Sequence, residues 1–281
     1  MRTKTITAII STLLFFTACG NNSSTAQTVS APEGLPLSSY MVEESAVMEV
    51  CDALKNAGLK NVDTYESWVK DFAGVAGEKA NLSDGWVSPD ALSGDPLSCA
   101  DFWEATYDYS DSDCRMTAML LMGDLVRAET TDTYQGTYLM FDVDAIENVE
   151  KYALLKERED LFTTLFGEMQ IPGSGFQDTL PHHWKEHGIR FDSDTASLIS
   201  VVIHDPYDRI AFVGHTGLLV NMGNHYLFVE KLAFEQPYQA TRLGSMDDLM
   251  RLFSARAEYF GEEGAEDTLV YQNDTLIGKL E

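Results

Sequence analysis

The chain has 281 residues, with 19 lysines and arginines against 45 aspartates and glutamates, and its formal net charge is −26 at pH 7. A field of this sign repels nucleic acid and anionic membrane surfaces, so neither is an expected partner. Cationic substrates and divalent ions remain compatible with it.

The N-terminus has the layout of a secretory signal peptide. Basic residues precede an apolar run over residues 6–16, which is too short to span a membrane. Small residues then lead to Cys19, as at the cleavage site of a bacterial lipoprotein. We therefore predict a signal peptide over residues 1–18 and a lipid on Cys19. The mature protein would be extracytoplasmic and anchored to the bacterial membrane, at the cell surface or in the periplasm. An ordinary signal peptide is the alternative.

Residues 20–36 are rich in asparagine, serine, threonine, glycine and proline. Such a composition buries too little surface to fold. We therefore expect residues 19–36 to form a lipidated, flexible tether. The remaining residues, 37–281, are long enough for one substantial α+β domain.

The first part of this domain has the periodicity of helices. Apolar residues at helical spacing predict helices over residues 42–57, 65–76, 113–128 and 147–166, with a short helical segment over 99–107. The helix over residues 113–128 is apolar around nearly its whole circumference, so we expect it to be central and buried.

The last third of the chain changes to the period of strands. Strands are predicted over residues 197–204, 210–213, 215–222, 226–234 and 238–243, followed by a helix over 245–259 and a hairpin over 268–280. Helices first and an antiparallel sheet afterwards predict an α+β protein, with N-terminal helices packed on the sheet.

Three residues in this pattern are the parts of a thiol nucleophile system. Cys114 opens the central helix, where backbone N–H groups and the helix dipole favour a thiolate. His215 opens a strand between Gly214 and Gly217, which would leave room for a substrate carbonyl. Glu230 lies on the next strand, near enough across the predicted hairpin to orient the imidazole. A buried structural cysteine and a core histidine are the alternative interpretation.

This order of residues resembles the papain-like superfamily, in particular its bacterial NlpC-type branch, over about residues 110–245. The resemblance implies a papain-like core in which Cys114 is the nucleophile, His215 the general base and acid, and Glu230 the orienting residue. The implied activity is thiol hydrolysis or acyl transfer on amide bonds of peptide or cell-wall substrates, with no cofactor. Tyr107 or Tyr109, upstream of the nucleophile, would then be a candidate for the oxyanion hole.

The cysteine count bears on the same hypothesis. If Cys19 carries a lipid, three cysteines remain, which is an odd number for an extracytoplasmic chain. With Cys114 as the free thiol, Cys51 and Cys99 are the candidate disulfide. A chain without any disulfide is the alternative.

A zinc peptidase pattern competes with the thiol system. His183, Glu186 and His187 match the H-x-x-E-H pattern, in which two histidines one helical turn apart bind zinc and the glutamate is the base. Candidates for a third ligand are Glu258, Glu262 and Glu263. The alternative is a surface turn whose histidines face solvent.

The whole chain also resembles a bacterial lipoprotein family that carries the domain of unknown function 4300. The resembling stretches are residues 180–184 (LPHHW), 213–217 (VGHTG), 228–231 (FVEK) and 237–240 (PYQA). This resemblance implies a lipid-anchored surface protein and no established reaction. A non-catalytic surface or binding lipoprotein on the same fold is therefore the second functional hypothesis.

Overall fold

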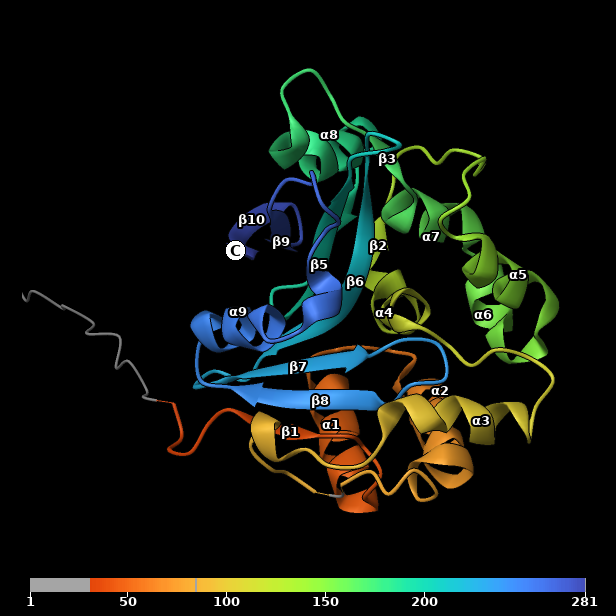
Figure 1. Ribbon diagram of the computed structural model, residues 1–281, viewed down its shortest axis with the longest axis vertical. Coiled ribbons are helices and arrows are strands. Elements are labelled where there is room, and N and C mark those ends of the chain that lie inside the picture. Colours follow the sequence, from red (N-terminus) through yellow and green to blue (C-terminus); the bar gives the residue numbers. More distant parts are fainter. Residues whose placement is uncertain (1–30, 84, 281) are drawn as a thin grey trace, which may run out of the picture.

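A computed structural model describes residues 31–83 and 85–280 of the protein (Figure 1). The predicted signal peptide and the predicted lipid site at Cys19 lie outside the described residues. Within residues 31–83 and 85–280, none of the helices has the length and apolar character needed to cross a membrane.

The α-helices lie mostly in the first two-thirds of the chain. Their bounds are α1 Glu44–Asn56, α2 Val62–Phe72, α3 Cys99–Glu104, α4 Cys114–Met122, α5 Met140–Asn148, α6 Ala153–Lys156, α7 Glu159–Phe166, α8 Thr179–Glu186 and α9 Met246–Ser254. The start of α9 is fixed by a capping box, in which Ser245 and Asp248 each accept a hydrogen bond from the backbone of the other.

The long strands lie in the last third of the chain. The strands are β1 Leu37–Ser39, β2 Val126–Arg127, β3 Met169–Gln170, β4 Arg190–Phe191, β5 Ala196–Asp205, β6 Ile210–Asn221, β7 Tyr226–Lys231, β8 Tyr238–Leu243, β9 Thr268–Gln272 and β10 Thr275–Leu280. The main sheet has the order β1-β8-β7-β6-β5-β9-β10, with β3 beside β6. Its pairs are antiparallel, which confirms the predicted α+β class.

Helices cover the two faces of this sheet unequally. The larger core lies between one face and the helices that precede β5, with α4 packed directly against β6 and β7 (Figure 1). The smaller core lies under α9 on the other face and contains Phe228 and Phe253. The predicted burial of the central helix is confirmed, because from Met116 to Met122 every side chain of α4 is buried.

A β-bulge in β6 decides which face its residues occupy. The neighbouring residues Val201 and Val202 of β5 pair with His215 and Val213, so Gly214 is the extra residue. Odd-numbered residues of β6 point into the larger core before the bulge and into the smaller core after it. The bulge therefore turns His215 towards the face that α9 covers.

Three predicted helices are shorter or interrupted in the structure, and one of them, predicted over residues 245–259, ends at Ser254. The central helix ends at Met122, because Gly123 starts a 3-10 turn and Val126 enters β2. The continuous helix predicted over residues 147–166 is wrong, since Val149 has extended backbone and separates α5 from α6 and α7.

The break after α5 is explained by tertiary contacts. It lets Lys151 and Tyr152 turn inwards at the following 3-10 turn. The ammonium group of Lys151 lies 3.0 Å from carboxylates of two other segments, and the Tyr152 hydroxyl donates to a backbone carbonyl at 2.9 Å. These contacts outweigh the local preference for a continuous helix.

Candidate functional site

His215 and Glu230 are joined by a buried hydrogen bond. Glu230 lies on β7 opposite Gly217, two residues after His215 on β6. The Nε2 atom of His215 is 2.7 Å from a carboxylate oxygen of Glu230, and each residue is 1% exposed. The contact that the hairpin register predicts is thus present in the structure.

Arg256 keeps Glu230 ionised. Its guanidinium donates two hydrogen bonds of 2.7 Å to the carboxylate, and Gln239, directly opposite on β8, donates another of 3.3 Å. Burial raises the pKa of Glu230, but Arg256 and His215 outweigh burial and hold that pKa at about 2. The carboxylate therefore accepts the hydrogen bond from His215.

This contact fixes the tautomer of His215. A carboxylate can only accept, so Nε2 carries the proton and Nδ1 is left as the basic nitrogen. Burial lowers the pKa of the imidazole by more than Glu230 raises it. His215 is consequently neutral in the folded protein, with one free lone pair.

Cys114 lies at the start of α4, against an unpaired edge of β6. Among the described strands, β7 joins β6 only after Thr216. The first turn of α4 fills this edge: Arg115 donates to the carbonyl of Val213 at 3.3 Å, and the backbone of Thr216 lies near enough to the Cys114 sulfur to lower the pKa of the thiol. The thiol is therefore next to the peptide that joins His215 to Thr216.

The Cys114 thiol is buried and protonated in this arrangement. Cys114 is 5% exposed. Burial and the carboxylate of Asp113 raise the pKa of Cys114 to about 12, and Arg115 opposes them only in part. Asp113 caps α4 by accepting the N–H of Met116 at 2.8 Å, so the helix start supplies a negative charge as well as its dipole. The predicted stabilisation of a thiolate by the helix start is therefore not found in this structure.

A segment after α9 covers the His215–Glu230 pair. Tyr259 lies over the imidazole of His215, with ring centroids 4.9 Å apart and planes inclined by 25°, and its hydroxyl accepts a hydrogen bond from Arg256. We refer to residues 254–267 as the cover segment. A groove of about 670 Å³ lies on one side of it, lined partly by leucines, and a depression of about 270 Å³ lies on the other.

The glycines around His215 do not hold space for a substrate. A Cβ atom on Gly217 would lie 2.5 Å from Cζ of Phe228, and one on Gly214 would lie 2.4 Å from Cδ1 of Ile203. Both glycines are needed because neighbouring core side chains come so close to the backbone. The room predicted for a substrate carbonyl is already filled.

The structure gives Tyr107 and Tyr109 other roles than the predicted oxyanion hole. Their rings pack on each other and on Trp103. The hydroxyl of Tyr107 donates to Asp71 at 2.7 Å, which with burial raises its pKa to about 12. Both tyrosines belong to an aromatic cluster built around Trp103, and we do not retain them as oxyanion candidates.

The predicted disulfide between Cys51 and Cys99 is wrong, because both are free, buried thiols. Cys51 lies on α1, where burial and then Glu66 of α2 raise its pKa to about 12. Cys99 begins α3 and directs its sulfur at the carbonyl of Asp95, 4.0 Å away. The two thiols therefore have separate surroundings, Cys51 near α2 and Cys99 near the turn before α3.

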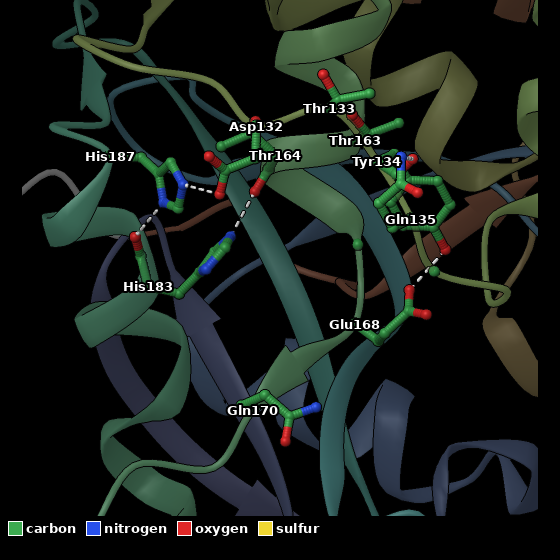
Figure 2. Close-up of a pocket in the computed structure, with 12 residues that line it drawn as sticks. Asp132, Thr133, Tyr134, Gln135, Thr163, Thr164, Glu168, Gln170, His183 and His187 are labelled. Carbon is green, nitrogen blue, oxygen red and sulfur yellow. Dashed lines mark hydrogen bonds and ion pairs between the residues drawn. The ribbon is translucent and has the colours of Figure 1, made fainter.

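The two histidines of the zinc pattern are engaged by protein groups. Figure 2 shows His183 and His187 beside a pocket of about 360 Å³ that Glu168 also lines. His183 donates through Nε2 to the carbonyl of Thr164 at 2.9 Å. The ring of His187 lies 2.9 Å from the carbonyl of His183 and 2.8 Å from a carboxylate oxygen of Asp132.

The other parts of the zinc pattern lie elsewhere. Glu186 is exposed and 3.4 Å from His182. Two of the predicted third ligands, Glu258 and Glu262, line the depression beside the cover segment. In the part of the chain that the structure describes, no three side chains of metal-binding type are grouped around one point. The predicted ligand set is therefore not assembled.

Sequence reasoning missed Arg256, Tyr259 and Gln239. Gln239 could have been found, because the strand pattern that places Glu230 on β7 also places a polar residue opposite it on β8. Arg256 and Tyr259 lie in the part of the predicted helix 245–259 that is not helical, because α9 ends at Ser254. Their positions depend on how α9 packs on the sheet.

Comparison with protein-family models matches residues 37–277 to a family described as Domain of unknown function (DUF4300). No curated protein and no solved structure matches the chain. The matched residues include α1 to α9 and every residue of the site around His215. The chain therefore belongs to the Domain of unknown function (DUF4300) family.

Proposed function

We propose that the protein is a papain-like thiol hydrolase or acyl-transferase acting on amide bonds of peptides, including cell-wall peptides. Cys114 is the nucleophile, His215 the general base and acid, and Glu230 the orienting residue. The observation that carries the proposal is the hydrogen bond of 2.7 Å between His215 and Glu230. It leaves Nδ1 as the basic nitrogen on a strand whose next peptide contacts the Cys114 sulfur.

The reaction begins with a proton transfer, because both partners are neutral. The proton of the Cys114 thiol moves to Nδ1 of His215, and the thiolate attacks the carbonyl carbon of the amide. The tetrahedral intermediate collapses with cleavage of the C–N bond, and His215 gives its proton to the leaving amine. Glu230 stabilises the imidazolium that exists between these steps.

The second half of the reaction restores the thiol. A water molecule, or the amine of an acceptor, gives a proton to His215 as it attacks the thioester carbonyl. The C–S bond then breaks, and the sulfur takes the proton back from His215. Water yields a carboxylic acid and an acceptor amine yields a new amide.

Alkylation of Cys114 tests the proposed pair. We expect the His215→Ala change to slow modification of Cys114 by iodoacetamide at pH 7 by roughly tenfold or more, because the imidazole no longer takes the thiol proton. Peptide mass spectrometry would give the rate for each cysteine separately. Cys51 and Cys99 are the internal controls, since they lie in other helix contacts. A Cys114 rate that is unchanged in His215→Ala would contradict the proposal.

A non-catalytic binding lipoprotein on the same fold is the second candidate. The observation that favours it is the burial of Cys114 and His215, which no substrate reaches without a movement of the protein. The alkylation experiment separates the two. Cys114 that reacts no faster than Cys51 and Cys99, and is insensitive to His215, would favour the binding protein.

The lipid anchor is a separate part of the proposal. It is supported by the basic start, the apolar run and the position of Cys19 in the sequence. We expect the wild-type protein, produced in a bacterium, to partition with the membrane fraction, and the Cys19→Ala variant to lose the lipid. Absence of a lipid from the N-terminal peptide of the mature wild-type protein, measured by mass spectrometry, would contradict lipidation at Cys19.

A further inference from the structure

Two side chains of the cover segment reach the protein interior, and both contact the candidate catalytic pair. The backbone N–H of Glu266 also donates to Nδ1 of His204 on β5 at 3.0 Å. Over residues 254–267, all of which the structure describes, Tyr259 is the one buried residue. The side chain of Arg256 is 12% exposed and its guanidinium is bound to Glu230. Most of the other side chains of the segment face solvent. The segment therefore has little apolar contact of its own to hold it in place.

The two hollows beside the cover segment lie on either side of these attachments. Arg256 and Tyr259 line the groove of about 670 Å³, and Gly214, next to His215, lines the depression of about 270 Å³. Glu258 lines both. Movement of Arg256 and Tyr259 away from the sheet would open the groove towards the His215 ring, which Tyr259 covers.

We propose that the cover segment is a gate, and that Arg256 and Tyr259 are positioning residues that hold the His215–Glu230 pair closed until the segment lifts. The opening is a physical property of the segment and stands whether or not the protein is an enzyme. The purpose assigned to it, admission of substrate to Cys114, rests on the proposed function. The segment ends at Thr268 of β9, whose hydroxyl donates to the carbonyl of Tyr259 at 2.7 Å, so this hydrogen bond breaks when the segment lifts.

Opening would also change the chemistry beneath the segment. Burial is the largest cause of the raised pKa of Cys114, so entry of water favours its thiolate. Arg256 lowers the pKa of His215, so withdrawal of its guanidinium makes the imidazole a stronger base. Tyr259 lies close enough to Cys114 for a thiolate there to raise the pKa of its phenol. Exposure and activation of the thiol are therefore coupled.

The three free cysteines of the described chain allow a direct test. In the full-length protein, we expect Tyr259→Ala to raise the iodoacetamide rate of Cys114 by roughly tenfold, the usual strength of a lost aromatic contact. The rates of Cys51 and Cys99, which are buried on α1 and α3, should stay unchanged. Tyr259→Phe is the matched control, because it keeps the ring on His215 and loses the hydroxyl, and its Cys114 rate should remain near that of wild type.

The wild-type protein provides a second measurement that depends on no variant. Local opening exposes little surface, whereas global unfolding exposes much, so the urea dependence of alkylation distinguishes them. We expect the Cys114 rate to rise only weakly with urea below the unfolding transition. The rates of Cys51 and Cys99 should rise steeply, because those thiols are reached by global unfolding.

The outcomes separate the gate from the enzyme. Equal acceleration of all three cysteines in Tyr259→Ala, or equal urea dependence in wild type, would overturn the gate. Selective acceleration of Cys114 that is lost when His215→Ala is added supports both the gate and the thiol–imidazole pair. Selective acceleration that persists without His215 supports the gate and contradicts the proposed function.

Discussion

Glu230 is a carboxylate enclosed by protein, and its neighbours rather than water keep it ionised. Arg256, His215 and Gln239 together supply hydrogen bonds to both of its oxygens. If one of these partners is removed, a buried charge is left without the opposite charge or hydrogen bond that compensates it. The structural and the proposed catalytic roles of Glu230 therefore depend on the same contacts.

The charge of Glu230 predicts a specific loss of stability in acid. Its pKa is about 2 in the folded protein, against 4.5 for the unconstrained group. Because folding lowers this pKa, the ionised carboxylate stabilises the folded state by about 3 kcal/mol. This stabilisation is fully present above pH 4.5 and is lost as the pH falls towards 2. We expect the free energy of unfolding in urea to fall more steeply from pH 7 to pH 3 for wild type than for Glu230→Gln.

The comparison isolates this one group, since the other carboxylates are common to both proteins. At pH 7, Glu230→Gln should itself be less stable by about 3–5 kcal/mol, because Arg256 is left buried beside a neutral amide. If the free energy of unfolding depends on pH in the same way for wild type and Glu230→Gln, the carboxylate of Glu230 is not preferentially ionised in the folded state.

At the scale of elements, α9 is the platform from which the cover segment starts, and its N-terminal cap fixes its position. Ser245 accepts the N–H of Asp248, and Asp248 accepts the N–H groups of Ser245 and Gly244. Ser245→Ala should therefore lower the free energy of unfolding by about 1 kcal/mol, measured by urea denaturation. Ser254→Ala, at the exposed end of the same helix, should change it by less than about 0.5 kcal/mol. Equal losses would show that the cap is not the cause.

The elements that the sequence predicts best are the long strands of the sheet. Strands β5 to β8 are runs of mostly buried residues bounded by turns, so their existence, their pairing and the diagonal contact of His215 with Glu230 follow from the sequence. The helix expected over residues 147–166 fails because Lys151 and Tyr152 serve partners far away in sequence. Local periodicity does not contain that information.

The residues of the candidate site also fall into those that the sequence predicts and those that it does not. Residues on regular elements, Cys114, His215 and Glu230, were identified from the sequence, and the hydrogen bond of the last two is present. Arg256 and Tyr259 were not, because the packing of α9 brings them over the sheet after a helix has ended. For Cys114 the sequence reasoning considered the helix dipole but not burial or the cap residue Asp113, both of which raise the pKa of the thiol.

At the scale of the whole molecule, a formal net charge of −26 makes self-repulsion a term in stability. Salt screens this repulsion, with a Debye length of about 10 Å at 0.1 M. We therefore expect the melting temperature at pH 7.5 to rise by several degrees as sodium chloride increases from roughly 50 to 500 mM. The rise should shrink at pH 5, closer to the sequence pI of 4.4. A melting temperature that falls with salt would show that attractive ion pairs outweigh the net repulsion.

The single extra residue at Gly214 makes the site depend on the length of β6 more than on its composition. Side chains alternate between faces, so deletion of this residue would transfer one half of the strand to the opposite side of the sheet. The imidazole of His215 would then point into the larger core and lose Glu230 without any change in its own identity. Substitutions along this strand can adjust the site in small steps, whereas a change of one residue in its length removes the site in a single step.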